Sequence, residues 1–237
     1  MATYCVSDIH GDYDKYRKLL RRISFSDRDT LYVLGDAVDR GPRPMDVLLD
    51  MMMRPNVIPI VGNHEFMALQ CLRTLSEEIT EEAVESFDET ALRALMEWQG
   101  VGGEPTIKDF GRLSAEERED VLDYLESFDL YAETEAGGRK FVLIHAGPEG
   151  FSPERPLTDY RLHELIFKVP DYGRVYYPDR YLVTGHRPTF TIPGAGMEPP
   201  EGRIYMANNH IAIDCGCGFG GPLGAVCLDT MEEFYAL

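Results

Sequence analysis

The stretch DTLYVLGDAVDRG (residues 29–41) joins an apolar run to a charged end. Its first half is typical of a strand buried on both faces, because hydrophobic residues follow one another with little polar alternation. Gly35 then permits a sharp turn, and Asp36, Asp39 and Arg40 come directly after it. The stretch therefore predicts a central strand that presents charged side chains at its carboxyl end.

Four further apolar runs end in the same way, each with a glycine beside the polar residues. The polar side chains that follow these runs are Asp8, His10, Asn63, His64, Glu65, His145 and His186. In open α/β sheets, ligands gather outside the carboxyl ends of the strands. We therefore expect aspartate, histidine and asparagine side chains from five strand ends to line one cleft.

The fold class follows from the order of the predicted elements. Apolar residues recur at helical spacing in residues 13–23, 45–53 and 65–75, each after a predicted strand, and Asp12 is a candidate N-cap. This order predicts a parallel sheet covered by helices. From residue 130 the strand signal returns. We expect an α/β fold of the four-layer α+β kind, with two packed mixed β-sheets flanked by helices.

The expected organisation is a single domain over residues 1–237, with a helical insertion at about 76–128. Two interpretations of the insertion stay open: it caps the cleft and selects substrates, or it covers one sheet. Trp98 and Phe110 could line such a cap or belong to the core. The segment GFGGPLGAVCLDT (218–230) is expected to close the second sheet and to carry no chemistry.

The composition limits the partners and the compartment. A net charge of −18 over 237 residues repels nucleic-acid backbones and anionic membranes, so we expect neither as a partner. No apolar stretch approaches the roughly 20 residues of a membrane span, and the first residues do not resemble a secretory signal. Five cysteines at irregular spacing predict reduced, mostly buried thiols. We therefore expect a cytoplasmic protein.

Six of the polar side chains at the strand ends form a plausible metal-binding set. They are Asp8, His10, Asp36, Asn63, His145 and His186. Carboxylates, imidazoles and one amide oxygen suit manganese, iron or zinc better than magnesium or calcium. Six ligands exceed the needs of one catalytic site and suit two divalent ions about 3.5–4 Å apart. A phosphate ester is the natural substrate for such a pair.

The segments DIHG, GDAVDRG, GNHE, HAG and GH follow one another in this order between residues 8 and 186. Together they resemble the phosphoprotein phosphatase branch of the calcineurin-like metallophosphoesterases. The resemblance is strongest to the small bacterial and bacteriophage lambda-type serine/threonine phosphatases, and WQGVGGEPT (98–106) extends it.

The resemblance implies a role for each matching residue. Asp8, His10 and Asp36 would bind the first ion, Asp36 would bridge to the second, and Asn63, His145 and His186 would complete it. The ions would be manganese, with iron or zinc as alternatives.

The same resemblance implies the catalytic groups. Arg40 would bind the substrate phosphate, assisted by Asn63 and Arg187. His64 would be the general acid that protonates the leaving oxygen, and Asp39 would orient it. A hydroxide between the two ions would attack phosphorus in line.

One feature departs from the family pattern. Family members commonly carry a Trp-x-Arg segment between the two later histidines, and its arginine contacts phosphate. The matching positions here are Phe167, Lys168 and Val169, so that arginine is missing. Lys168, Arg161 or Arg187 could compensate for it.

We interpret the sequence as a metal-dependent serine/threonine-type phosphoprotein phosphatase that hydrolyses a phosphorylated protein or a small phosphoester. The first alternative is a symmetrical diadenosine tetraphosphate hydrolase, although such enzymes usually have aspartate where this chain has Glu65 and are somewhat longer. The alternative of another class is a non-catalytic metal-binding scaffold. A nuclease is disfavoured by the net charge of −18. The natural substrate, the loaded metals and the oligomeric state stay open.

Overall fold

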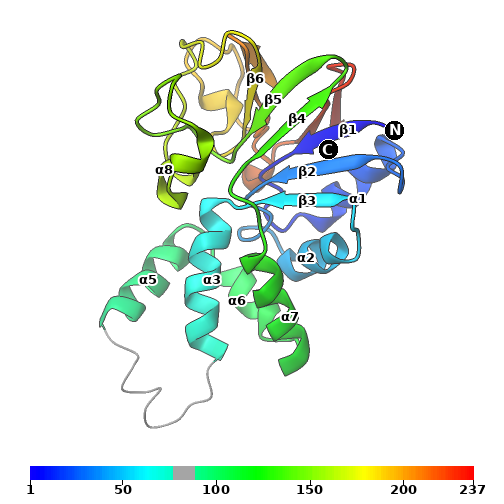
Figure 1. The fold of residues 1–237 in the computed structure, drawn as a ribbon. Helices are drawn as coiled ribbons and strands as arrows, with labels where there is room; N and C mark the ends of the chain where they lie inside the picture. The colour runs from blue at the N-terminus through cyan, green and yellow to red at the C-terminus, as the bar shows by residue number, and fades with distance from the viewer. Residues whose placement is uncertain (77–88) are drawn as a thin grey trace.

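Two five-stranded β-sheets pack face to face in the computed structural model, which describes residues 1–76 and 89–237 (Figure 1). The first sheet contains, in spatial order, β10 (Glu233–Ala236), β9 (Leu223–Cys227), β1 (Thr3–Val6), β2 (Thr30–Leu34) and β3 (Val57–Ile60). The second contains β4 (Ala132–Ala136), β5 (Arg139–Leu143), β6 (Tyr181–Thr184), β8 (His210–Ala212) and β7 (Tyr205–Ala207). Both sheets mix parallel and antiparallel pairs, so the predicted fold class is confirmed.

The parallel strands determine where polar side chains collect. In the first sheet, β1, β2 and β3 run parallel, and in the second, β5, β6 and β8 do so. The carboxyl ends of parallel strands lie at one edge of a sheet. The residues after these six strands are therefore brought toward each other, which the sequence analysis expected for five of them.

Three apolar layers hold the sheets and helices together. Side chains such as Leu34, Phe141 and Val226 form the layer between the two sheets. A larger cluster packs the helices onto the outer face of the first sheet, and a smaller one covers the outer face of the second. Both faces of each sheet are thus buried, which explains the near-continuous apolar runs of the central strands.

The helices of the described chain lie outside the sheets. They are α1 (Tyr13–Arg22), α2 (Pro44–Met52), α3 (Asn63–Ser76), α5 (Glu89–Gly100), α6 (Glu104–Phe110), α7 (Ala115–Glu126) and the short α8 (Leu162–Ile166). Asp12 caps α1 as predicted, because its Oδ1 accepts a hydrogen bond from the backbone N–H of Lys15 at 3.0 Å. No helix of the described residues is long and apolar enough to cross a membrane.

The predicted insertion is helical where the structure describes it. α5, α6 and α7 gather beside α3, as Figure 1 shows, and their breaks fall near residues 100–105 and 111–114. Residues 77–88 of the predicted insertion lie outside the described residues. All five cysteines are free and buried, as expected.

The predicted place of the C-terminal segment is wrong. β9 does not close the second sheet but pairs antiparallel with β1 in the first, with Cys5 opposite Val226. β10, which the sequence analysis did not predict, then forms the edge of this sheet beside β9. Every residue of β9 is buried, and a strand buried on both faces has the same apolar pattern in either sheet.

Candidate active site

An unusual backbone conformation marks the predicted site. Among the described non-glycine residues with positive φ are six of its members: Asp8, His10, Asp36, Asp39, Arg40 and His186, with φ between 48° and 71°. The left-handed region costs such residues about 1–3 kcal/mol each, and this strain clusters at functional sites. The strand ends therefore aim these side chains inward against a local conformational preference.

Close backbone packing makes room for the convergence. Gly35 has a φ of +79°, and a Cβ there would lie 2.6 Å from both the Cα of Gly62 and Nδ1 of His145. A larger residue would displace either the next strand end or the imidazole. Glycine at this turn thus allows ligands from both sheets to approach each other.

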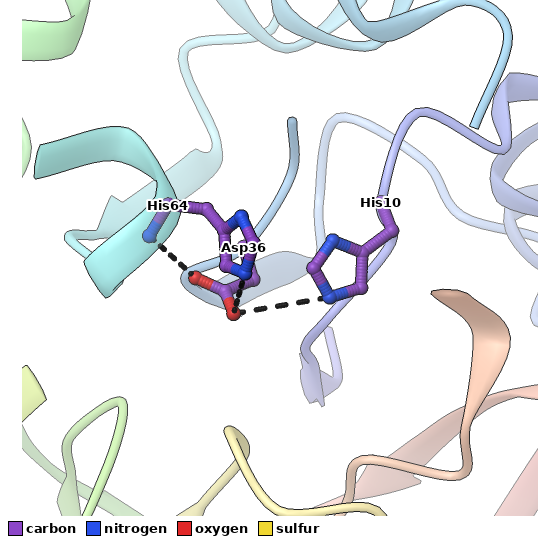
Figure 2. A group of neighbouring side chains, drawn as sticks. All are labelled: His10, Asp36 and His64. Carbon is purple, nitrogen blue, oxygen red and sulfur yellow. Dashed lines mark hydrogen bonds and ion pairs between the residues drawn. The ribbon is translucent and has the colours of Figure 1, made fainter. Parts of the chain in front are cut away.

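Asp36 lies at the centre of the site, between His10 and His64 (Figure 2). Its Oδ2 is 3.8 Å from Nε2 of His10 and 3.9 Å from Nε2 of His64. Its Oδ1 accepts a hydrogen bond from the backbone N–H of His64 at 3.1 Å and lies 3.4 Å from Nε2 of His145. One carboxylate therefore faces histidines from both sheets, as a bridging ligand would.

A second group of ligand atoms surrounds Asn63 at the start of α3. Its Oδ1 lies 3.0 Å from Nε2 of His145 and 2.9 Å from Nδ1 of His186. Nδ1 of His145 bonds the Leu34 carbonyl at 2.7 Å, so it acts as the donor nitrogen of the ring and leaves Nε2 as an acceptor. Nε2 of His145 and Oδ1 of Asn63 are then two facing acceptors, which repel one another unless a cation lies between them.

Asp8 connects the two groups. Its Oδ1 is 3.9 Å from Nε2 of His10, and its Oδ2 accepts hydrogen bonds from the Ser7 hydroxyl and, at 3.0 Å, from the backbone N–H of His186. His10 resembles His145 in its other contact, because its Nδ1 bonds the Val38 carbonyl at 3.0 Å. Histidine ligands of metals usually donate their second N–H in this manner, which fixes the tautomer.

Burial sets the charge state of the cluster. It lowers the pKa of His186 to about 3 and, helped by the Arg40 charge, lowers the pKa of His10 well below its usual range. These rings are therefore neutral near pH 7, the form that binds metal. Burial also raises the pKa of Asp36. The charge of His64 opposes this upward shift, and the charge of Asp8 adds to it. Buried carboxylates among neutral imidazoles fit divalent cations well.

His64 and Asp39 form a buried hydrogen-bonded pair. Nδ1 of His64 lies 2.6 Å from Oδ2 of Asp39, which points the Nε2 edge toward Asp36 and Arg40. Burial alone lowers the pKa of His64, but the carboxylates of Asp36 and Asp39 outweigh it and the net shift is upward. A histidine that holds its proton more firmly suits a general acid.

Two residues of the insertion hold Asp39 by hydrogen bonds. The sequence analysis did not predict this role for either of them. The indole N–H of Trp98 on α5 donates to Oδ2 of Asp39 at 2.7 Å, and the Thr106 hydroxyl on α6 donates to Oδ1 at 2.5 Å. The backbone N–H of Asp39 also donates to the Thr106 oxygen at 2.9 Å. Both side chains are fully buried. The helices of the insertion thus fix the orientation of the His64–Asp39 pair, called the acid pair below.

Arg40 reaches into the centre of the site. Its Nη1 lies 2.8 Å from Nε2 of His10 and its Nη2 lies 3.1 Å from Nε2 of His64. The insertion holds its backbone, because the Arg40 N–H donates to the Gly102 carbonyl at 2.9 Å. The guanidinium also lies 4.6 Å from the ring centre of Phe219, in cation–π contact. A planar donor fork beside the ligands is suited to binding phosphate.

Glu65 orients the turn that follows β2. Its carboxylate accepts backbone hydrogen bonds from Asp36 and Ala37 at 2.7 Å and from Gly62 at 2.9 Å. These donors belong to the turns that follow β2 and β3. Glu65 therefore fixes the backbone of the central carboxylate rather than facing a substrate.

Arg187, expected to assist in phosphate binding, has a half-buried side chain without a hydrogen bond or ion pair to a protein partner among the described residues. Its charge acts on Tyr172, where it opposes the upward pKa shift caused by burial. The backbone of Lys168 pairs with Gly147, close to His145, while Arg161 precedes α8. Compensation by these residues stays a prediction.

Asp214 was also missed, although it follows a strand in the same way as the other acidic residues. It is buried beyond the end of β8, and its Oδ1 accepts a hydrogen bond from the backbone N–H of Gly216 at 2.9 Å. Burial and the charge of Asp8 raise its pKa well above the usual range. The segment IAIDCG (211–216) shows the same pattern as the segments that contain Asp8 and Asp36, in which an apolar run is followed by an aspartate with a glycine nearby.

Curated relatives of this chain include symmetrical bis(5'-nucleosyl)-tetraphosphatases. This chain is 31% identical over 192 residues to a symmetrical bis(5'-nucleosyl)-tetraphosphatase of Delftia acidovorans, an alignment that covers 76% of this chain and 59% of the relative. It therefore spans less than two thirds of that relative's length. A protein of the same name from Neisseria gonorrhoeae is 27% identical over 277 aligned positions, with coverage of 98% and 94%.

Solved structures agree on the fold. A putative diadenosine tetraphosphatase superposes with a TM-score of 0.66 at 19% identity, covering 99% of this chain and 92% of its own. A serine/threonine phosphatase from Saccharomyces cerevisiae superposes with a TM-score of 0.56 at 14% identity, covering 96% and 72%. The profile of the calcineurin-like phosphoesterases matches residues 1–214. With its two sheets and its converging histidines and aspartates, the chain belongs to the calcineurin-like phosphoesterase family.

Proposed function

We propose that this protein hydrolyses symmetrical dinucleoside tetraphosphates to two nucleoside diphosphates. The proposal rests mainly on the similarity to the relative from Neisseria gonorrhoeae, whose name states this activity. The alignment covers 98% of this chain and 94% of the relative. The solved serine/threonine phosphatase structure is 14% identical to this chain, so its similarity concerns the fold alone. The comparisons thus favour the dinucleotide alternative.

The reaction would take place at the ligand cluster. Asp8, His10 and Asp36 would hold one divalent ion, and Asp36, Asn63, His145 and His186 a second, in agreement with the separations between their ligand atoms. When bound, such ions generate a nucleophile from water at neutral pH and neutralise negative charge on phosphate. Manganese, iron and zinc all suit these ligands.

Arg40 would bind the phosphate chain beside the cluster. Its fork lies within 3.1 Å of both His10 and His64, so a phosphate oxygen that contacts the guanidinium also lies near the candidate acid. Phe219 stacks on the guanidinium and limits its freedom. Arg40 therefore stabilises the charge that develops on the attacked phosphoryl group.

A second candidate is phosphomonoester hydrolysis, and the acid pair favours it. An alcohol leaves as a strongly basic alkoxide unless it is protonated, whereas a nucleoside diphosphate leaves as a stable anion. The acid His64 and its orienting Asp39, with Trp98 and Thr106, form a buried network. Such an arrangement has most value for a poor leaving group.

The direct test compares three substrates with the metal-reconstituted protein. We expect diadenosine tetraphosphate to be cleaved to ADP alone, with a higher kcat/KM than a phosphoserine peptide or glycerol phosphate. Chromatography of the products distinguishes symmetrical cleavage, which gives only ADP, from release of AMP and ATP. A phosphopeptide preferred over the dinucleotide, or AMP among the products, would contradict the proposal.

His64→Asn separates the two leaving groups. We expect turnover of glycerol phosphate to fall by about 10²–10⁴-fold, because the alkoxide then departs without general acid assistance. Turnover of diadenosine tetraphosphate should fall much less. Metal content, measured in the same preparation, should be unchanged. Equal losses on both substrates together with lost metal would instead make His64 a ligand.

Trp98→Phe tests whether the insertion positions the acid pair. The variant removes one hydrogen bond to a buried carboxylate, which costs about 1.5–3 kcal/mol. We expect slower turnover of glycerol phosphate, little change with the dinucleotide and unaltered metal content. Phe110→Leu is the control, because Phe110 is buried in the same insertion and has no hydrogen bond with Asp39. If both variants behave alike, Trp98 contributes packing only.

A further inference from the structure

Three aromatic rings that the mechanism does not use lie together beside the metal ligands. Phe66 on α3, His163 on α8 and Phe167 just after α8 form this group, called the aromatic platform below. The rings of His163 and Phe167 stack with an interplanar angle of 13° and a centroid distance of 5.7 Å. Phe66 meets both edge-on, at 4.9 Å from His163 and 6.2 Å from Phe167.

The aromatic platform adjoins the candidate active site through Phe167. Phe66 belongs to the first turn of α3, the helix that begins at Asn63. The backbone of Phe167 hydrogen-bonds the ring of the candidate ligand His186. The next residue, Lys168, pairs through its backbone with Gly147, two positions after His145. The Phe167 end of the aromatic platform therefore lies next to a candidate metal ligand.

The exposure of the rings separates them from the core. Phe167 is 41% exposed and His163 is exposed, whereas Phe66 beneath them is half-buried. None of the three belongs to the buried clusters that hold the sheets and helices. Edge-on packing on Phe66 supports the two parallel rings, and both residues that carry them are exposed to solvent.

We propose that the aromatic platform binds one nucleobase of the substrate by stacking on Phe167 and His163. This inference rests on the proposed dinucleotide function and adds the group that recognises the nucleoside. Every nucleobase has a flat π-face, and base–aromatic stacking contributes about 1–3 kcal/mol per base. A phosphate chain bound at the metal centre leaves its nucleoside free to reach these rings.

Equilibrium binding to the metal-loaded protein tests the platform without relying on turnover. The probes are α,β-methylene-ADP, which carries a base, and methylenediphosphonate, which has the same bridged phosphates and no base. For Phe167→Ala we expect the Kd of the first to rise on the order of tenfold and that of the second to stay unchanged. Phe167→Tyr should restore binding, and Phe167→Leu should not, because leucine is apolar without a π-face.

Met53→Ala is the matched control for loss of an exposed apolar side chain. Met53 is 83% exposed and precedes the amino end of β3, at the opposite end of the strand from the metal ligands. It should leave both Kd values unchanged. The inference is overturned if Phe167→Ala weakens both probes equally or neither, or if Phe167→Leu binds as well as Phe167→Tyr.

The outcome is separable from that of the proposed function. If the wild-type protein does not release ADP from diadenosine tetraphosphate, the proposed function fails, whatever the binding data show. A selective loss of α,β-methylene-ADP binding in Phe167→Ala would still establish the platform as a base-binding surface. Conversely, the wild-type protein could release ADP while Phe167→Ala weakens binding of both probes equally. The proposed function would then stand, and the base-binding role of the platform would be rejected.

Discussion

One electrostatic constraint underlies this structure: buried acceptor atoms face each other at the carboxyl ends of strands from both sheets. Asp36 lies beside His10 and His145, and Asn63 lies between His145 and His186. Such an arrangement is costly unless cations balance it. Backbone strain adds to this cost, because site residues are held at positive φ. Strain and charge together point to a centre shaped around divalent ions.

The insertion takes part in this centre rather than only covering a sheet. Trp98 and Thr106 hold Asp39, and the Gly102 carbonyl holds the backbone of Arg40. Any movement of α5 or α6 would therefore displace the His64–Asp39 pair and the Arg40 guanidinium together. This coupling gives the insertion a positioning role, which differs from both the cap and the cover that the sequence suggested.

Local sequence patterns made much of the fold and of the candidate ligand cluster predictable. An apolar run followed by glycine and a polar residue identifies a strand end, and this pattern located Asp8, Asp36 and Asn63 before any contact was known. Asp214 obeys the same pattern and could have been found by it. The placement of β9 could not be predicted, because a strand buried on both faces has the same apolar sequence pattern in either sheet. The partners of Asp39 were equally hidden, since they lie 59 and 67 positions away in the chain.

Metal analysis tests the central claim most directly. We expect the protein, reconstituted with manganese and dialysed, to retain two ions per chain, with two anomalous scattering peaks about 3.5–4 Å apart in crystals. Asp36→Asn should lose both ions, because its carboxylate faces ligands of each. Asp39→Asn should keep both, because its carboxylate contacts His64, Trp98 and Thr106 instead. A single ion per chain, or two ions retained in Asp36→Asn, would contradict the account.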